Sequence, residues 1–319
     1  MNCVFRFRQL TASLVCLALP LSMAAQESGP DSPADSSPAG MLTGPSSSDP
    51  VSVIELVDRA AECDVIVLGE IHNNDAGHRF QLDVIRELVD RGDSVAVSME
   101  QFERDVQGVV DDYLAGRIDE ATFLENSRPW KNYDPHYRPI VEFAKQHKLP
   151  ILAGNVPRRL AGDVADDRPV DRADSVYMPR STTAPQNAYW DKFRKTMEGH
   201  GGIDDEEKLM AFYRSQCLKD DAMAEAITDY LDTHPHQRKR VVHLCGHFHS
   251  DYGLGTVARV RQRRPLSRAV VVTMESEPES GDRVLENGNR RAHFVFWTPA
   301  NPVVEKVTEA DASENPDRS

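Results

Sequence analysis

Histidine and glutamate side chains occur in two short clusters of this sequence. Glu70 and His72 are two residues apart, His78 follows closely, and His247 and His249 repeat the two-residue spacing much later in the chain. Residues two apart in an extended segment point to the same side, so each cluster can present both of its side chains to one pocket. Imidazole and carboxylate groups together suit proton transfer or the binding of a divalent transition metal.

Both clusters follow apolar runs that are typical of buried strands, at residues 64–69 and 240–245. Comparable runs occupy 94–99, 149–154, 269–274 and 293–297, and three of these are followed closely by a polar residue: Glu100, Asn155 and Glu275. Because the carboxyl ends of parallel strands meet at one edge of a sheet, we expect these polar residues to gather there.

The runs alternate with segments of helical periodicity, among them 102–126 and 206–233. This order predicts an α/β fold with a central, mostly parallel sheet of about six strands, flanked by helices. Residues from about 157 to 235 contain little strand signal and are expected to form an inserted helical cap. One α/β domain over residues 51–305 is therefore predicted.

The two ends of the chain differ from this domain. Arg6 and Arg8 precede an apolar run from Leu10 to Leu21 that is too short to span a membrane as a helix, which predicts a signal peptide at residues 1–24. Residues 25–50 are expected to form a disordered tether, and 306–319 an acidic disordered tail. The protein is therefore expected in the periplasm or cell envelope. A lipid anchor on Cys16 remains the alternative, although bulky residues precede that cysteine.

The composition of the chain argues against some classes of binding partner and site. A net charge of −14 over 319 residues argues against binding to nucleic acid or to anionic membrane surfaces, because both need a basic face. After loss of the signal peptide three cysteines remain, Cys63, Cys217 and Cys245, and all are expected as free thiols because they lie in or beside apolar segments. No phosphate-binding glycine loop and no nucleophile elbow occur in the sequence.

The remaining histidines are expected to be structural or superficial. His243 and His293 fall within the strand runs and are expected to be structural. The others lie in predicted loops or on helices, away from the two strand-end clusters, and are expected at the surface: His136, His147, His200, His234 and His236.

Five sequence blocks, in order over residues 51–265, give the chain a family resemblance. It resembles the ChaN-like, cofacial-haem-binding family of exported bacterial proteins, within a wider group that includes the erythromycin esterases and TraB/Tiki-type proteins. The blocks are Leu68-Gly69-Glu70-Ile71-His72 with His78, Ser98-Met99-Glu100-Gln101-Phe102-Glu103-Arg104-Asp105, Leu152-Ala153-Gly154-Asn155-Val156-Pro157-Arg158, Leu218-Lys219-Asp220-Asp221-Ala222-Met223-Ala224, and Gly246-His247-Phe248-His249 with Tyr252-Gly253.

The resemblance implies an exported haem-binding protein linked to iron acquisition, with two haems stacked between the subunits of a homodimer. In such a protein a tyrosine ligates the haem iron and a histidine helps to hold the porphyrin carboxylates. Tyr137, Tyr133 and Tyr252 are the candidate ligands, in that order, and His249 is the candidate histidine. Asn155 and Arg158 are expected to support the site. The family's frequent lipoprotein cysteine is missing here, so membrane attachment is doubtful.

The wider group implies an alternative function, a metal-dependent hydrolase at the same sheet edge. A divalent transition metal held by some of His72, His78, His247 and His249 would polarise a water molecule. Glu70 or Glu100 would then take the proton of that water. The sequence leaves open whether the protein is an enzyme.

Overall fold

The chain is described from a computed structural model, which covers residues 40–199, 203, 205–233, 239–278, 283 and 291–299. The predicted signal peptide with Cys16, most of the predicted tether and the predicted acidic tail lie outside these residues, as do His200, His234 and His236. Within them, no helix is both long enough and apolar enough to cross a membrane.

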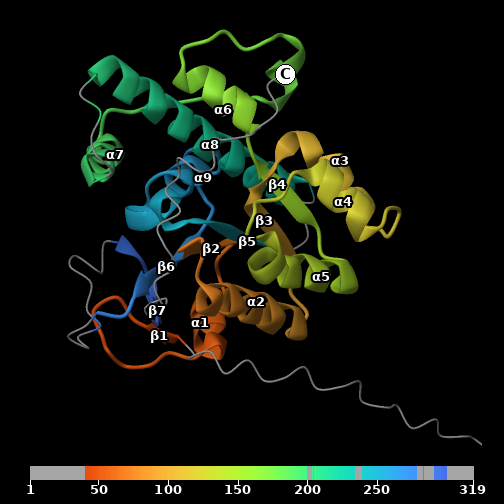
Figure 1. Cartoon of the computed structure of the whole chain (residues 1–319). Helices are drawn as coiled ribbons and strands as arrows, with labels where there is room; N and C mark the ends of the chain where they lie inside the picture. The colour runs from red at the N-terminus through yellow and green to blue at the C-terminus, as the bar shows by residue number, and fades with distance from the viewer. Residues whose placement is uncertain are drawn as a thin grey trace, which may run out of the picture. The chain divides into compact units, whose positions relative to one another are not determined.

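A seven-stranded, mostly parallel sheet forms the centre of the fold, which confirms the predicted α/β class (Figure 1). The strands lie in the order β1-β7-β6-β2-β5-β3-β4, and the pairing between β1 and β7 is antiparallel while all the other pairings are parallel. Their bounds are Met41–Thr43 (β1), Val65–Glu70 (β2), Ser94–Glu103 (β3), Ile151–Asn155 (β4), Lys239–Gly246 (β5), Ala269–Ser276 (β6) and Phe294–Thr298 (β7).

The sheet has one strand more than the six that were predicted. This additional strand, β1, lies within residues 25–50, the segment expected to form a disordered tether. Leu42 and Thr43 are buried in the fold, and the Trp297 indole Nε1 donates a 2.9 Å hydrogen bond to Thr43 Oγ1. A three-residue strand is too short to show a period in the sequence, so its pairing with β7 is a tertiary effect.

Helices cover both faces of the sheet (Figure 1). One apolar core packs the sheet against helices on the first face, and a second core, which includes Val65, Val67, Ile227 and Val257, packs the opposite face. The helices on the first face are α1 (Val53–Arg59), α2 (Asp75–Asp90), α3 (Gln107–Leu114), α4 (Glu120–Ser127) and α5 (Arg138–His147). The helices on the opposite face are α8 (Glu206–Asp232) and α9 (Thr256–Arg263).

The predicted insert ends with α8, and the part before it consists of helical elements. These are α6 (Arg158–Ala165), η3 (Ala173–Tyr177) and α7 (Ala188–Gly199), of which α6 and α7 pack on α8. Tyr189, Trp190 and Phe193 of α7 form a separate aromatic core with Tyr213 of α8.

Strand β3 is longer than predicted and the helix after it is divided. The expected stop at Glu100 is wrong because Glu100, Gln101 and Phe102 are all buried and the strand continues to Glu103, with a change in its register against β4. The single helix expected over 102–126 is instead η1 (Arg104–Val106), α3 and α4.

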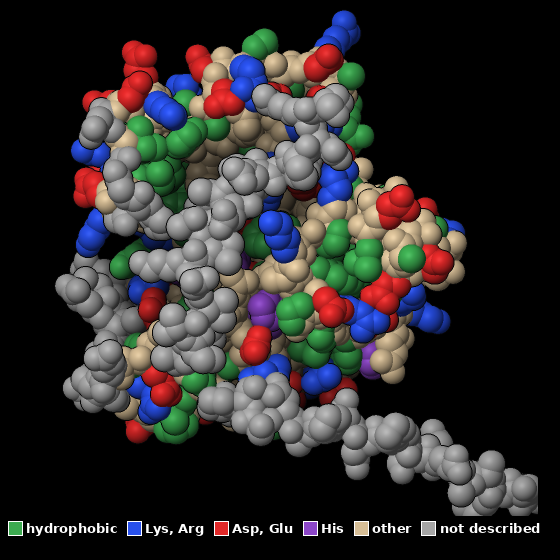
Figure 2. Space-filling model, in the orientation of Figure 1, with side chains coloured by type: hydrophobic (Ala, Val, Ile, Leu, Met, Phe, Trp, Pro, Cys, Tyr) green, Lys and Arg blue, Asp and Glu red, His purple; other side chains and the backbone are tan. Residues whose placement is uncertain are grey.

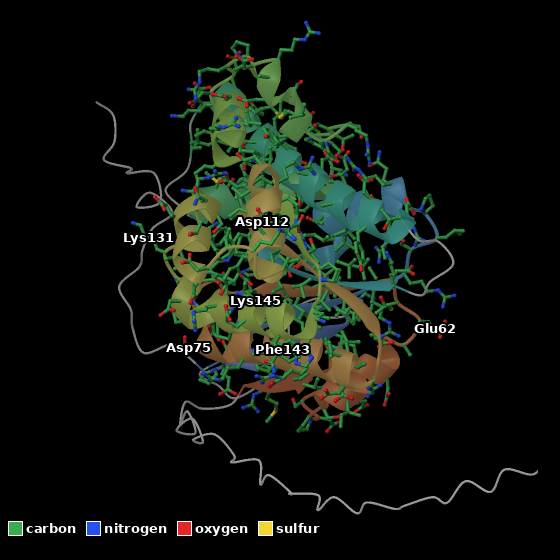
Figure 3. The ribbon with its side chains drawn as sticks, turned by 90° about the vertical axis from the view of Figure 1, so that its right-hand side faces the viewer. Glu62, Asp75, Asp112, Lys131, Phe143 and Lys145 are labelled. Carbon is green, nitrogen blue, oxygen red and sulfur yellow. The ribbon has the colours of Figure 1, made fainter. Side chains whose placement is uncertain are left out.

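The strand direction places the polar clusters at one edge. Every residue of β2 is buried, as expected for a parallel strand covered on both faces, and Glu70 at its end is paired in register with Gly246 of β5. Figure 3 shows Glu62, which precedes β2, and Asp75, which follows it, at opposite sides of the molecule. The residues that follow β2, β3, β4 and β5 therefore share the carboxyl edge of the sheet.

Candidate functional site at the carboxyl edge of the sheet

Glu70 is the most heavily hydrogen-bonded carboxylate at this edge. Its Oε1 accepts from His72 Nδ1 at 2.9 Å, from Gln101 Nε2 at 2.9 Å and from the Tyr137 hydroxyl at 2.6 Å. Its Oε2 accepts from Gln81 Nε2 at 2.7 Å. These four donors leave Glu70 little capacity to accept a proton from a substrate. Glu70 is instead placed to orient His72.

His72 extends from this buried anchor to the surface of the protein. Its side chain is 40% exposed, and its ring meets Trp130 edge-on with the ring centroids 5.0 Å apart. Because Nδ1 is hydrogen-bonded to Glu70, Nε2 is the ring nitrogen that this anchor does not use. Burial lowers the pKa of His72, but the hydrogen bond and charge of Glu70 outweigh burial and leave this pKa above its ordinary value.

Glu100 and Gly246 border the other side of the His72 ring. A Cβ atom on Gly246 would lie 3.0 Å from His72 Nε2 and 3.8 Å from Glu100 Oε2, so the glycine permits the ring to approach this closely. The Gly246 backbone N–H donates a 2.8 Å hydrogen bond to Glu100 Oε2. Burial opposes the charge on Glu100, yet the adjacent His249 holds the pKa of this carboxyl well below its usual range.

A second buried carboxylate–imidazole pair lies behind Glu100. His249 Nδ1 is 2.8 Å from Asp220 Oδ1, and His249 Nε2 is 3.5 Å from Glu100 Oε1. Asp220, in the middle of α8, also accepts hydrogen bonds from Thr256 and Tyr189. Burial lowers the pKa of His249, but the two carboxylates raise it to about 9, which favours the cationic form of the ring. His249 Nε2 also lies 2.8 Å from Gln216 Nε2.

The four histidines proposed as metal ligands do not form a ligand set. Both ring nitrogens of His78 are already occupied, Nδ1 by Gln81 Oε1 at 2.9 Å and Nε2 by the His72 carbonyl oxygen at 3.0 Å, while His249 is held by Asp220. Among the described residues, no group of three or more His, Cys, Asp or Glu side chains is arranged to hold a metal ion. The residues present therefore do not fit the proposed metal.

One of the histidines expected at the surface is buried. His136 stacks on His78 with ring centroids 4.4 Å apart, and its Nε2 lies 2.8 Å from Asp75 Oδ1. The expectation was wrong because Tyr133–Tyr137 forms a π-helical turn that directs His136 inward. His147 is exposed, as expected, and His243 is buried beside Ser98.

The three candidate tyrosines have different environments. Tyr137 is completely buried and donates to Glu70, and Tyr133 is also buried. Tyr252 is 43% exposed. Tyr252, the last of the three in the order expected from the sequence, is thus the most exposed of them. His249, expected to hold a porphyrin carboxylate, is also buried, whereas the side chain of His247 is 39% exposed.

Tyr252 lies in a loop with an unusual backbone. Its φ is 63°, in the left-handed region, and Gly253 and Gly255 also have positive φ values of 65° and 56°. A bulky residue in this region is uncommon and costs of order 1–3 kcal/mol. The loop therefore holds the phenol outward at a cost to stability, which is typical of functional positions.

Basic side chains surround this loop. Three of them converge on one oxygen, Asp251 Oδ2: Arg291 Nε at 2.9 Å, His247 Nδ1 at 3.2 Å and Lys192 Nζ at 3.7 Å. Lys192 also lies over the Tyr252 ring, 5.7 Å from its centroid. Burial lowers the pKa of Lys192 to about 8, against the opposing charge of Asp251.

The supporting residues expected from the sequence lie on or near β4. The Asn155 side-chain amide donates to the Glu100 carbonyl oxygen at 3.1 Å, so Asn155 positions the end of β3. Arg158 is exposed at the start of α6.

Sequence reasoning missed several residues, chiefly Asp220 and Lys192. Asp220 and Asp221 are both fully buried in α8. The available sequence signal for Asp220 was this pair of adjacent acidic residues beside apolar ones in a helical segment. Lys192 lies in α7 of the insert, and no motif or spacing in the sequence around it indicated a functional role.

Comparison with known proteins identifies the family. Residues 56–260 match the family model described as "Haem-binding uptake, Tiki superfamily, ChaN". The chain belongs to this family. Comparison with the curated proteins gave no match.

The fold of this ChaN family member is supported by a solved structure. A structure described as cofacial haem binding to ChaN of Campylobacter jejuni is similar with a TM-score of 0.63 and 16% identity, over 82% of this chain and 97% of that chain. An erythromycin esterase in its open conformation matches with a TM-score of 0.44 and 10% identity, over 82% of this chain and 83% of that one.

Proposed function

We propose that this ChaN family member binds haem, and that Tyr252 is the residue that ligates the haem iron. The main support for this proposal is that Tyr252 is exposed and has a left-handed backbone conformation, whereas Tyr133 and Tyr137 are buried. A phenolate is an established axial ligand of haem iron. The matching family and the cofacial haem of the Campylobacter jejuni protein support haem as the molecule that is bound.

The surroundings of Tyr252 fit haem in charge as well as in ligand type. Haem carries carboxylate side chains, and Lys192, His247 and Arg291 supply basic groups beside the phenol in a protein of net charge −14. In Figure 2, histidine, charged and hydrophobic side chains lie next to one another near the middle of the face shown.

The proposal extends to location and assembly. The apolar segment from Leu10 to Leu21 after two arginines supports export to the periplasm or cell envelope, where haem uptake would take place. The family's cofacial arrangement supports a homodimer in which two such loops face each other across stacked haems.

Titration with hemin tests the ligand assignment. The wild type is expected to shift the Soret band, and Tyr252→Phe is expected to lose the shift or to give a different one. Tyr137→Phe is the matched control because it removes a buried phenol, and it is expected to retain the wild-type spectrum. An identical spectrum in Tyr252→Phe would contradict the assignment, and no shift in the wild type would overturn haem binding.

A second function is favoured by the arrangement of His72. We infer that His72 is a general base for hydrolysis, because Glu70 fixes its Nδ1 and leaves Nε2 for a water molecule, on a side chain that is 40% exposed. In this step His72 Nε2 takes a proton from water, and the hydroxide oxygen adds to the carbonyl carbon of an ester. The bond from that carbon to the alcohol oxygen then breaks, and the departing alkoxide takes the proton back from His72 Nε2. Glu100, whose pKa is lowered, and His249, whose pKa is raised, lie near His72 and act on its charge.

This second function is tested with an activated ester such as p-nitrophenyl acetate. His72→Asn is expected to lower the catalysed rate by about 10²-fold or more, the usual contribution of a general base. His147→Asn, which changes an exposed imidazole on α5, is the control and is expected to hydrolyse the ester at the wild-type rate. Equal rates in the two variants would exclude His72 as the base.

A further inference from the structure

We propose that Lys192 binds a carboxylate of the bound tetrapyrrole, so that the site selects porphyrins with free carboxylate side chains. This inference rests on the proposed binding of haem at Tyr252. It assigns a specificity-determining role to a residue of the inserted cap that lies outside the sequence blocks shared with the family.

Lys192 connects the cap to the loop that follows β5. Its Nζ donates a 2.8 Å hydrogen bond to the Phe248 carbonyl oxygen and lies 4.6 Å from the centroid of the Phe248 ring. The same ammonium is 5.7 Å from the centroid of the Tyr252 ring. Lys192 would therefore hold a carboxylate of a tetrapyrrole that is ligated through the neighbouring Tyr252 phenol.

The ammonium of Lys192 has hydrogen-bonding capacity left for a ligand. A lysine has three donors, and the Phe248 carbonyl oxygen takes one of them. Asp251 Oδ2 is 3.7 Å away, which is longer than a hydrogen bond, and Arg291 Nε is closer to that oxygen, at 2.9 Å. Lys192 is thus a cation whose nearest carboxylate is engaged mainly by another residue.

The position of Lys192 also favours a strong interaction with an anion. Its side chain is only 17% exposed, so water screens its charge less than it would screen that of a surface lysine. A carboxylate from a ligand would make a charge-assisted hydrogen bond there. Arg291 is less available for this role because it pairs with both Asp251 and Glu275.

Another basic side chain extends the positive surface around the loop. Arg261 of α9 approaches Gly253, because a Cβ atom there would lie 3.1 Å from Arg261 Nη1. The loop is therefore bordered by basic groups from the cap and from α9. Such a surface on an acidic protein is complementary to a dianionic ligand.

The test compares hemin with hemin dimethyl ester, in which both carboxylates are blocked, on the full chain. The affinity for each is measured by Soret titration of the wild type, Lys192→Met and Lys192→Arg. Lys192→Met is expected to weaken hemin binding by about tenfold or more, the typical effect of losing a hydrogen bond between charged groups. It is expected to leave binding of the ester unchanged. Lys192→Arg is expected to recover most of the affinity.

The control is Lys145→Met, because Lys145 also lies over an aromatic ring, that of Tyr113 at 3.5 Å, but on α5 (Figure 3). It is expected to bind both compounds like the wild type. If Lys192→Met weakens hemin and its ester equally, or weakens neither, the inference is overturned while haem binding stands. If the wild type binds neither compound, the proposed function itself fails.

Discussion

The Tyr137 hydroxyl donates a 2.6 Å hydrogen bond to Glu70 Oε1 in the interior of the protein. This contact gives the tyrosine a structural role and ties π-helical residues 133–137 to the end of β2. The phenol is therefore committed to a buried carboxylate. Burial and the negative charge of Glu70 both raise the pKa of Tyr137 far above its ordinary value.

Tyr137→Phe is predicted to destabilise the protein without changing haem ligation. A hydrogen bond to a charged group contributes about 1.5–3 kcal/mol, so the free energy of unfolding should fall by an amount in this range. Urea denaturation followed by circular dichroism measures the change. A wild-type stability in Tyr137→Phe would show that this hydrogen bond contributes nothing.

Glu70→Gln is predicted to lower the pKa of His72. The negative charge of Glu70 stabilises the imidazolium form, so its removal favours the neutral ring. Titration of the His72 ring resonances by NMR measures this pKa. Glu120→Gln changes a carboxylate that pairs with Arg138 and is expected to leave it unaltered. An unchanged His72 pKa in Glu70→Gln would show that the two side chains do not interact in solution.

The stabilisation provided by His249 is predicted to depend on pH. The pKa of His249 is raised from its ordinary value of 6.5 to about 9, so its contribution is complete below pH 6.5 and disappears as the pH rises through 9. The stability difference between the wild type and His249→Asn should therefore fall by about 3 kcal/mol over this range.

Lys192 titrates in the same pH range with the opposite sign, because its pKa is lowered in the folded protein. It is present in both the wild type and His249→Asn, so the difference between their unfolding free energies isolates His249. Urea denaturation at a series of pH values provides the measurement. A difference that does not vary with pH would contradict a cationic His249.

Gly246→Ala is predicted to displace His72 from Glu70. The added methyl group would lie 3.0 Å from two ring atoms of His72, so the ring must move, at a cost of about 1–3 kcal/mol. The His72 resonances and the unfolding free energy report this change. Gly162→Ala, in α6, is the control because a methyl group there meets nothing within 4 Å. Equal behaviour of the two variants would argue against close packing at Gly246.

Hemin is predicted to shift the protein toward a dimer. If two haems stack between subunits, sedimentation velocity with one equivalent of hemin should show a dimer, and Tyr252→Phe should show less of it. A wild-type protein that remains monomeric with hemin bound would contradict the cofacial arrangement while leaving haem binding intact.

The sequence predicts the parallel sheet and the position of its polar edge well, because both depend on local patterns. The apolar runs from 64 to 69 and from 240 to 245 become β2 and β5, and their register brings Glu70 beside Gly246. The free thiols are also as expected, since Cys63, Cys217 and Cys245 make no disulfide in the described part of the chain.

Side-chain exposure could not be predicted in the same way. Tyr137 and Tyr252 both lie in polar, aromatic segments, and only the tertiary packing buries the first and exposes the second. Asp220 lies in a helix some thirty residues before His249, and its contact with that imidazole depends on how α8 crosses the sheet. Such long-range contacts leave no periodic signal.

Resonance Raman spectroscopy of the hemin-loaded protein tests the central claim most directly. Excitation into the charge-transfer band between phenolate and iron should enhance the ring modes of a coordinated tyrosinate in the wild type. These modes should be lost in Tyr252→Phe and retained in Tyr133→Phe and Tyr137→Phe. Their absence from the wild type, or their persistence in Tyr252→Phe, would contradict Tyr252 as the haem ligand.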